Sequence, residues 1–78
     1  MQAANRSGII VGIFLLLLLL PPVTAADLAD QYYQEGVNLS YLGQYSEAVA
    51  AYDKAVFIRP TNVDAWNNRG VALDKLGQ

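Results

Sequence analysis

Three serines, seven carboxylates and five basic side chains are the groups through which this 78-residue chain could do chemistry. A serine nucleophile needs a neighbouring base, and histidine, the most common one, is absent from the sequence, as is cysteine. Zinc sites built from Cys or His, thiolate catalysis and disulfides are therefore excluded. Because Ser7, Ser40 and Ser46 have no imidazole partner, we predict that this segment is not an enzyme and holds neither a metal nor a cofactor.

The charged residues are spread along the chain rather than gathered. Glu47 and Asp53 lie near Lys54 and Arg59 in the sequence, which is typical of solvated charges on helix surfaces. The formal net charge is -2 and no cluster of Lys or Arg occurs, so the chain lacks the positive surface that binding to a phosphate backbone requires. We therefore expect no nucleic-acid partner.

The first 26 residues have the composition of an export signal. Arg6 and the N-terminal amine give a positive start, residues 8–20 form an unbroken apolar run, and a double proline then ends any helix. The small residues that follow permit cleavage after Ala25 or after Ala26, and the sequence does not choose between them. We predict a signal peptide over residues 1–26.

The alternative is that this segment stays in the membrane as an anchor. A spanning helix needs about 20 apolar residues to cross the hydrocarbon core, and residues 8–20 are fewer than that. A buried core helix is a poorer fit, because six consecutive leucines leave no polar face. In either favoured case residues 27–78 are expected outside the cytoplasm, secreted or in the cell envelope, and attached to the membrane only if the segment is uncleaved.

The chain repeats itself at an offset of 34 residues. Residues 29–44 align with residues 63–78, with identity at seven of the sixteen positions. The identical pairs are Asp30/Asp64, Gly36/Gly70, Val37/Val71, Leu39/Leu73, Leu42/Leu76, Gly43/Gly77 and Gln44/Gln78. A period of 34 residues is typical of arrays in which each unit is a helix, a turn and a second helix.

Spacing within the repeat predicts three helices. Tyr32, Gly36 and Leu39 recur at i, i+4 and i+7 on one helical face, and Gly43 suits the residue after the helix, where a left-handed conformation is needed. A second helix ends before Pro60, which cannot continue it. Its apolar face consists of Tyr45, Ala48, Val49, Tyr52, Ala55 and Val56. The third helix repeats the first with Trp66, Gly70, Leu73 and Leu76.

The sequence also predicts how the third helix begins and how closely the helices pack. Either Thr61, with Asp64 three residues later, or Asn62 can cap the third helix. Small residues on the apolar faces are expected to let paired helices approach to about 8–10 Å. These small residues are Gly36, Ala48, Ala55 and Gly70.

The pattern resembles the tetratricopeptide repeat family, whose units carry aromatic, Gly, apolar, Gly, aromatic, Ala, aromatic, Ala and Pro in order. The matching residues are Tyr32, Gly36, Leu39, Gly43, Tyr45, Ala48, Tyr52, Ala55 and Pro60, then Trp66, Gly70, Leu73 and Gly77 in the second unit. The sequence departs from the family at Glu35 and Arg69, where Leu is usual. The resemblance covers residues 29–78 and implies an all-α chain of antiparallel helix-turn-helix repeats in a TPR-type solenoid. One full repeat would span 29–62 and a partial one 63–78.

The resemblance also implies a scaffold that binds protein or peptide segments in a groove lined by the first helix of each unit. By that resemblance the groove positions are Asp30, Tyr33, Val37, Ser40 and Tyr41 in the first unit and Asp64, Asn67, Val71, Asp74 and Lys75 in the second. Tyr33 and Tyr41 lie off the core face, as partner contacts, as ordinary exposed tyrosines or as tyrosines covered by the segment next to the signal. A carboxylate clamp of Lys and Asn is not expected, because only Asn68 fits it.

A second hypothesis is a short membrane-anchored or self-associating structural protein of the envelope. A stack of this kind usually needs three or more repeats, and Trp66 and Leu73 would lack the second helix of their own unit. We therefore expect either that the chain belongs to a longer array or that it completes its core by self-association.

Overall fold

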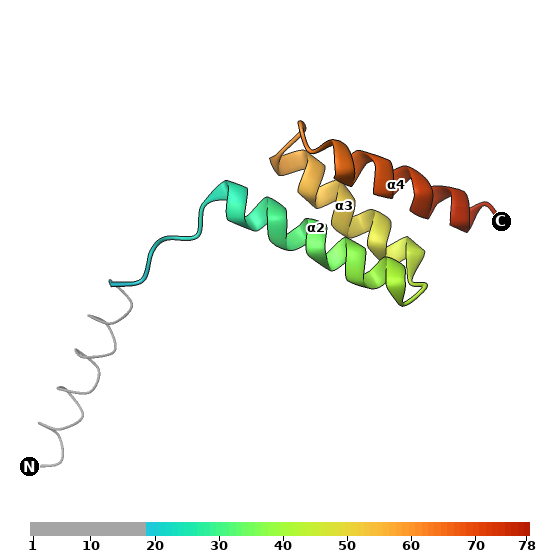
Figure 1. Ribbon diagram of the computed structural model, residues 1–78, viewed down its shortest axis with the longest axis horizontal. Helices are drawn as coiled ribbons and strands as arrows, with labels where there is room; N and C mark the ends of the chain where they lie inside the picture. Colours follow the sequence, from blue (N-terminus) through green and yellow to red (C-terminus); the bar gives the residue numbers. More distant parts are fainter. Residues whose placement is uncertain (1–18) are drawn as a thin grey trace, which may run out of the picture.

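Three helices make up most of the computed structural model, which describes residues 19–78. They are α2 (Ala25–Tyr41), α3 (Tyr45–Ile58) and α4 (Val63–Leu76), joined by short turns so that successive helices run antiparallel (Figure 1). The predicted all-α helix-turn-helix architecture is confirmed. Most of the predicted signal peptide, including nearly all of the apolar run 8–20, lies outside the described residues. Within residues 19–78, no helix combines the length and the apolar character needed to cross a bilayer.

The first helix begins earlier than the repeat alone predicts. It starts at Ala25, where Thr24 and Asp27 form a capping box. The Asp27 amide donates to Thr24 Oγ1 at 3.1 Å, and the Thr24 amide donates to Asp27 Oδ2 at 3.2 Å. These residues fall in the predicted cleavage region, so the same short stretch has the sequence features of a processing site and the structure of a helix start.

The turn between α2 and α3 is closed by Gly43, which has a φ of 75°. The Gln44 amide donates to the Leu39 carbonyl at 2.9 Å, and the Gly43 amide donates to the Ser40 carbonyl at 3.0 Å. This pair of bonds is a Schellman motif, which satisfies carbonyls that the helix end would leave free. The sequence predicted this left-handed conformation at Gly43.

The turn between α3 and α4 shows which residue caps the last helix. Asn62 is the N-cap, and its Oδ1 accepts from the Ala65 amide at 3.1 Å. Of the two caps left open by the sequence, the structure uses Asn62 and not Thr61. The indole Nε1 of Trp66 also donates to the Pro60 carbonyl at 2.8 Å, which ties α4 to the turn.

Replacing Asn62 with alanine is expected to lower the free energy of unfolding by about 1 kcal/mol, because the Ala65 amide loses its acceptor. Replacing the neighbouring exposed Thr61 with alanine is the control and should change stability by less than about 0.5 kcal/mol. Urea unfolding followed by circular dichroism measures both. Equal losses in the two variants would show that Asn62 does not cap the helix.

The core lies along α3, which contacts both α2 and α4. Tyr52 is the largest fully buried side chain among the described residues, at 1% exposure. Its ring lies against the backbone of Gly36 on α2. The remaining buried members of the cluster are Ala48, Ala55, Val56, Ala65 and Ala72.

Glu35 and Arg69, where the sequence departs from the family pattern, do not occupy the core. Glu35 is exposed on α2, and Arg69 is half-buried on α4, where its guanidinium pairs with Asp53 of α3. The charged head of Arg69 therefore stays at the surface of the helix pair while its stem packs.

Candidate binding groove

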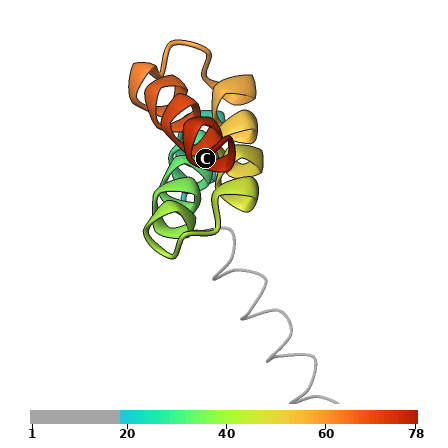
Figure 2. The ribbon, with the colours of Figure 1, turned by 90° about the vertical axis from the view of Figure 1, so that its right-hand side faces the viewer.

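An open hollow of about 270 Å³ lies between α2 and α4. Both helices sit on the same side of α3, which forms the back of the hollow (Figure 2). The residues that line it are Val37, Ser40 and Tyr41 of α2, Tyr45 and Tyr52 of α3, and Asn68, Val71 and Lys75 of α4. We refer to it as the α2–α4 groove.

The floor of the groove is held by hydrogen bonds between side chains. Tyr52 Oη and Ser40 Oγ lie 3.2 Å apart and share a hydrogen bond. Asn68 Nδ2 donates to Tyr33 Oη at 3.3 Å, which links α4 to α2. The rings of Tyr33 and Tyr52 lie 6.1 Å apart between centroids. These contacts set the positions of the floor side chains, because rotation of any one ring would break a bond to another helix.

The rim of the groove is exposed and apolar, with one cation. Tyr41 is 87% exposed, and Val71 faces solvent from α4. Lys75 lies beside them and belongs to neither of the two ion pairs in the described part of the chain. The rim therefore offers an aromatic ring, an aliphatic side chain and an ammonium group to anything that enters.

The other end of the same side is polar. A second hollow there is lined by Asp30, Tyr33, Gln34, Arg59, Thr61, Asn62, Val63 and Asp64. Arg59 Nη1 lies 3.4 Å from Asp30 Oδ1 in an exposed ion pair that links α2 to the end of α3. Such exposed pairs contribute little to stability. The ion pair therefore gives the polar hollow a charged surface and does little to hold α2 and α3 together.

The structure divides the predicted groove residues into three groups. Val37, Ser40, Tyr41, Val71 and Lys75 line the α2–α4 groove. Asp30, Tyr33 and Asp64 line the polar hollow. Asn67 and Asp74 are exposed on α4 and line neither of them.

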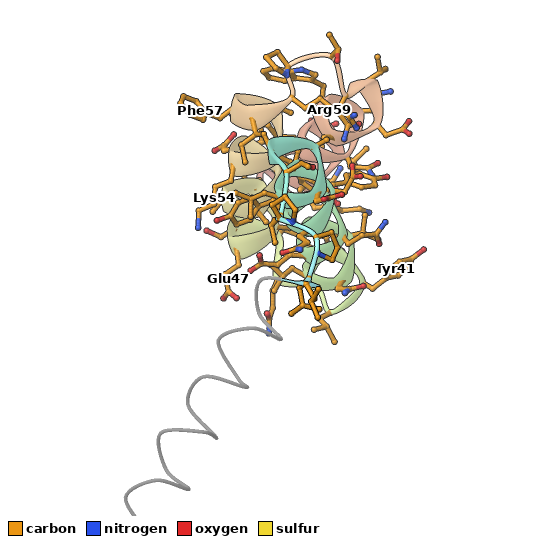
Figure 3. All side chains as sticks on the ribbon, turned by 90° about the vertical axis from the view of Figure 1, so that its left-hand side faces the viewer. Tyr41, Glu47, Lys54, Phe57 and Arg59 are labelled. Carbon is orange, nitrogen blue, oxygen red and sulfur yellow. The ribbon has the colours of Figure 1, made fainter. Side chains whose placement is uncertain are left out.

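Tyr33 and Tyr41 were left open by the sequence, and their environments differ. Tyr33 is half-buried and packs against the core, whereas Tyr41 stands free at the end of α2. Tyr41 is therefore the tyrosine that is available to a partner. Figure 3 shows it pointing away from the side chains of Glu47, Lys54 and Phe57, which lie on the α3 side.

The role of Asn68 and the second role of the α3 tyrosines could not be predicted from the sequence. Asn68 was named only as the one residue that fits a carboxylate clamp, and in the structure it donates to Tyr33, 35 residues earlier. Tyr45 and Tyr52 were assigned to the helix interface, and both also line the groove. No local pattern signals these contacts, because each depends on which helices become neighbours.

The groove has the chemistry of a binding surface. Its polar groups are hydroxyls, the Asn68 amide and the Lys75 ammonium. Exposed aromatic and aliphatic groups over a hydrogen-bonded floor suit an apolar side chain flanked by peptide groups.

Comparisons with known proteins give one family and one relative. The sequence profile of the family described as TPR repeat matches residues 29–77. The chain is 36% identical over 50 residues to an uncharacterized protein of Methanocaldococcus jannaschii, a match that covers 64% of this chain and 58% of that protein. The chain thus spans less than two thirds of the length of this curated relative. No solved structure matches the chain.

Proposed function

The chain belongs to the tetratricopeptide repeat family, and on that premise we propose that it is a scaffold whose α2–α4 groove binds a short peptide segment of a partner protein. The observation that carries this proposal is the exposure of Tyr41 and Val71 on either side of a groove whose floor is already hydrogen-bonded. Aromatic side chains at such positions contribute strongly to binding because they bury a large area at a small cost in conformational entropy.

An apolar side chain of the partner would enter between Val37 and Val71. The peptide backbone beside it would reach the hydroxyls of the groove and the Asn68 amide. A carboxylate on the partner would lie near Lys75, at the rim. The floor side chains would move little on binding, since they are held by bonds between helices.

The test of the groove starts from a display library of random 12-residue peptides, from which those that bind the chain are selected. Tyr41→Ala is expected to weaken the selected peptides by about tenfold or more, which corresponds to 1.4 kcal/mol or more of binding free energy. The matched control is Phe57→Ala, since Phe57 is a similarly exposed aromatic residue (86%) on α3 that does not line the groove. Peptides that bind the Tyr41 variant as well as the parent, or that lose affinity with the Phe57 variant, would contradict the proposal.

We also propose that the scaffold works outside the cytoplasm. The support is the order of a positive start, an apolar run and small residues in positions 1–26. Cleavage after Ala25 or Ala26 would remove Thr24 and with it the capping box of α2. The test is the intact mass of the protein from the membrane fraction and from the secreted fraction. A species that begins at Ala26 or Asp27 supports export with cleavage, a membrane-bound species that begins at Met1 supports an anchor, and a cytoplasmic species with an intact N-terminus contradicts export.

A further inference from the structure

The side of α3 that faces solvent carries a stripe of four exposed residues, which are Glu47, Ala50, Lys54 and Phe57. Steps of three and four residues place side chains on one face of a helix. Phe57 is 86% exposed, and Glu47 and Lys54 take part in no ion pair within residues 19–78. Figure 3 shows Glu47, Lys54 and Phe57 on the same side of the molecule. We call the four residues the outer face of α3.

We propose that the outer face of α3 binds the same face of a second copy of the chain, with the two helices antiparallel. The order of the charges indicates this partner. Glu47 and Lys54 lie seven residues apart on one stripe, with Ala50 between them. A two-fold axis near Ala50 would set each Glu47 opposite Lys54 of the other copy, so one surface supplies both halves of two ion pairs.

The direction of the two helices follows from the same charges. Parallel helices related by a two-fold axis would place Glu47 against Glu47 and Lys54 against Lys54, and like charges at such positions repel each other. Antiparallel helices place opposite charges together at both ends of the contact. The charges therefore specify the antiparallel direction and the register.

Apolar contact supplies most of the binding free energy, because exposed ion pairs contribute little. Ala50 lies near the two-fold axis, where its small side chain lets the two backbones approach closely. Phe57 would lie over the start of α3 in the second copy. Burial of its ring, which is 86% exposed in the single chain, is favourable.

Contacts within the single chain leave Glu47 and Lys54 available for this pairing. Lys54 Nζ lies 5.2 Å from the centroid of the Tyr32 ring on α2, and an ammonium has three donors, so it can still bind a carboxylate. The other carboxylate of α3 belongs to Asp53, which is already paired with Arg69 of α4. Glu47 is therefore the carboxylate of α3 that remains for a second copy.

The pairing would leave the α2–α4 groove of each copy accessible. Because α3 forms the back of the groove, two copies that meet through α3 would have their grooves on opposite sides of the pair (Figure 2). Two copies would then hold two peptide segments at once, which strengthens binding to a partner that carries both. This inference goes beyond the proposed function, because each groove is formed by one copy alone.

The test uses an introduced thiol, since the sequence has no cysteine. Ala50→Cys is made in the full chain, which is kept in mild detergent to solvate the apolar run 8–20. We expect a disulfide-linked dimer on oxidation, because the two thiols would meet near the two-fold axis. Asn67→Cys, at an exposed position of α4, is the matched control and should cross-link about tenfold more slowly or not at all.

Charge reversal then tests the register. Glu47→Lys and Lys54→Glu, each combined with Ala50→Cys, set like charges against each other and should slow cross-linking by about tenfold. A mixture of the two variants has opposite charges at both pairs, and should give a dimer with the mass of one chain of each kind. Phe57→Ala should also slow cross-linking, whereas Tyr41→Ala should not, which separates this face from the groove. Circular dichroism should show the parent helix content in each variant.

Two results would overturn the proposal. Equal cross-linking of Ala50→Cys and Asn67→Cys would show that two copies meet without using the outer face of α3. Unchanged cross-linking in the single charge reversals or in Phe57→Ala would show that the two outer faces do not pair as antiparallel helices. In either case the peptide-binding test with Tyr41→Ala still decides the function of the groove.

Discussion

Replacing Tyr52 with alanine is expected to abolish cooperative folding of the three helices. The change removes the largest fully buried side chain of the described residues and leaves a cavity between α2, α3 and α4. Truncation of a large buried aromatic residue costs about 3–5 kcal/mol. A domain of this size has little more stability than that to lose. Thermal unfolding followed by circular dichroism at 222 nm should show a broad, low-temperature transition or none.

Two control variants test whether the buried ring of Tyr52 is what stabilises the fold. One removes only its hydroxyl, and the other removes an exposed tyrosine ring. Tyr52→Phe keeps the ring and loses only the hydrogen bond to Ser40, which should cost about 0.5–1.5 kcal/mol. Tyr41→Ala removes an exposed ring and should stay within about 0.5 kcal/mol of the parent. If Tyr52→Ala melts as Tyr52→Phe does, the buried ring is not what holds the helices together.

The second large effect is expected at Gly36, where substitution by alanine should destabilise the protein by about 1–3 kcal/mol. The new Cβ would meet three ring atoms of Tyr52 at 2.5 to 2.9 Å. The ring cannot turn aside, because it is buried and its hydroxyl is bonded to Ser40. Alanine stabilises a helix by about 1 kcal/mol relative to glycine. The measured loss of stability is therefore the cost of the clash with Tyr52 minus this gain.

Gly70→Ala is the matched control for this prediction. It makes the same substitution at the equivalent position of the repeat, on a helix whose glycine has open space around it. Only the helix propensity then acts, and the protein should gain about 0.5–1 kcal/mol. Urea unfolding of the two variants should therefore move the midpoint in opposite directions. A shift in the same direction would show that the contact with Tyr52 does not limit position 36.

Several features could be predicted because their causes are local. The apolar spacing of 3.6 residues marks the three helices, Pro60 ends the second, and Gly43 takes the positive φ that closes the first turn. Each of these depends on residues within about one helical turn. The early start of α2 at Ala25 is local too, since Thr24, three residues before Asp27, fits a capping box. It went unpredicted because the same residues also suit a cleavage site.

The groove was predicted only in part. The 34-residue spacing identified the helix faces that carry Val37, Tyr41 and Val71, and the structure brings these three together around one hollow. The bond between Asn68 and Tyr33 and the contribution of Tyr45 and Tyr52 to the groove lie outside any local pattern. They arise because α2 and α4 both pack on α3, which brings side chains of α2 and α4 together.

Repeated local spacing was therefore enough to predict the family, the helices and the turns. It could not determine the environment of each repeated residue. Gly36 and Gly70 stand at the same position of the repeat, yet one lies against a buried ring and the other in open space. This difference arises from helix packing, because burial depends on the neighbouring helix, and α3 covers this face of α2 but the other side of α4.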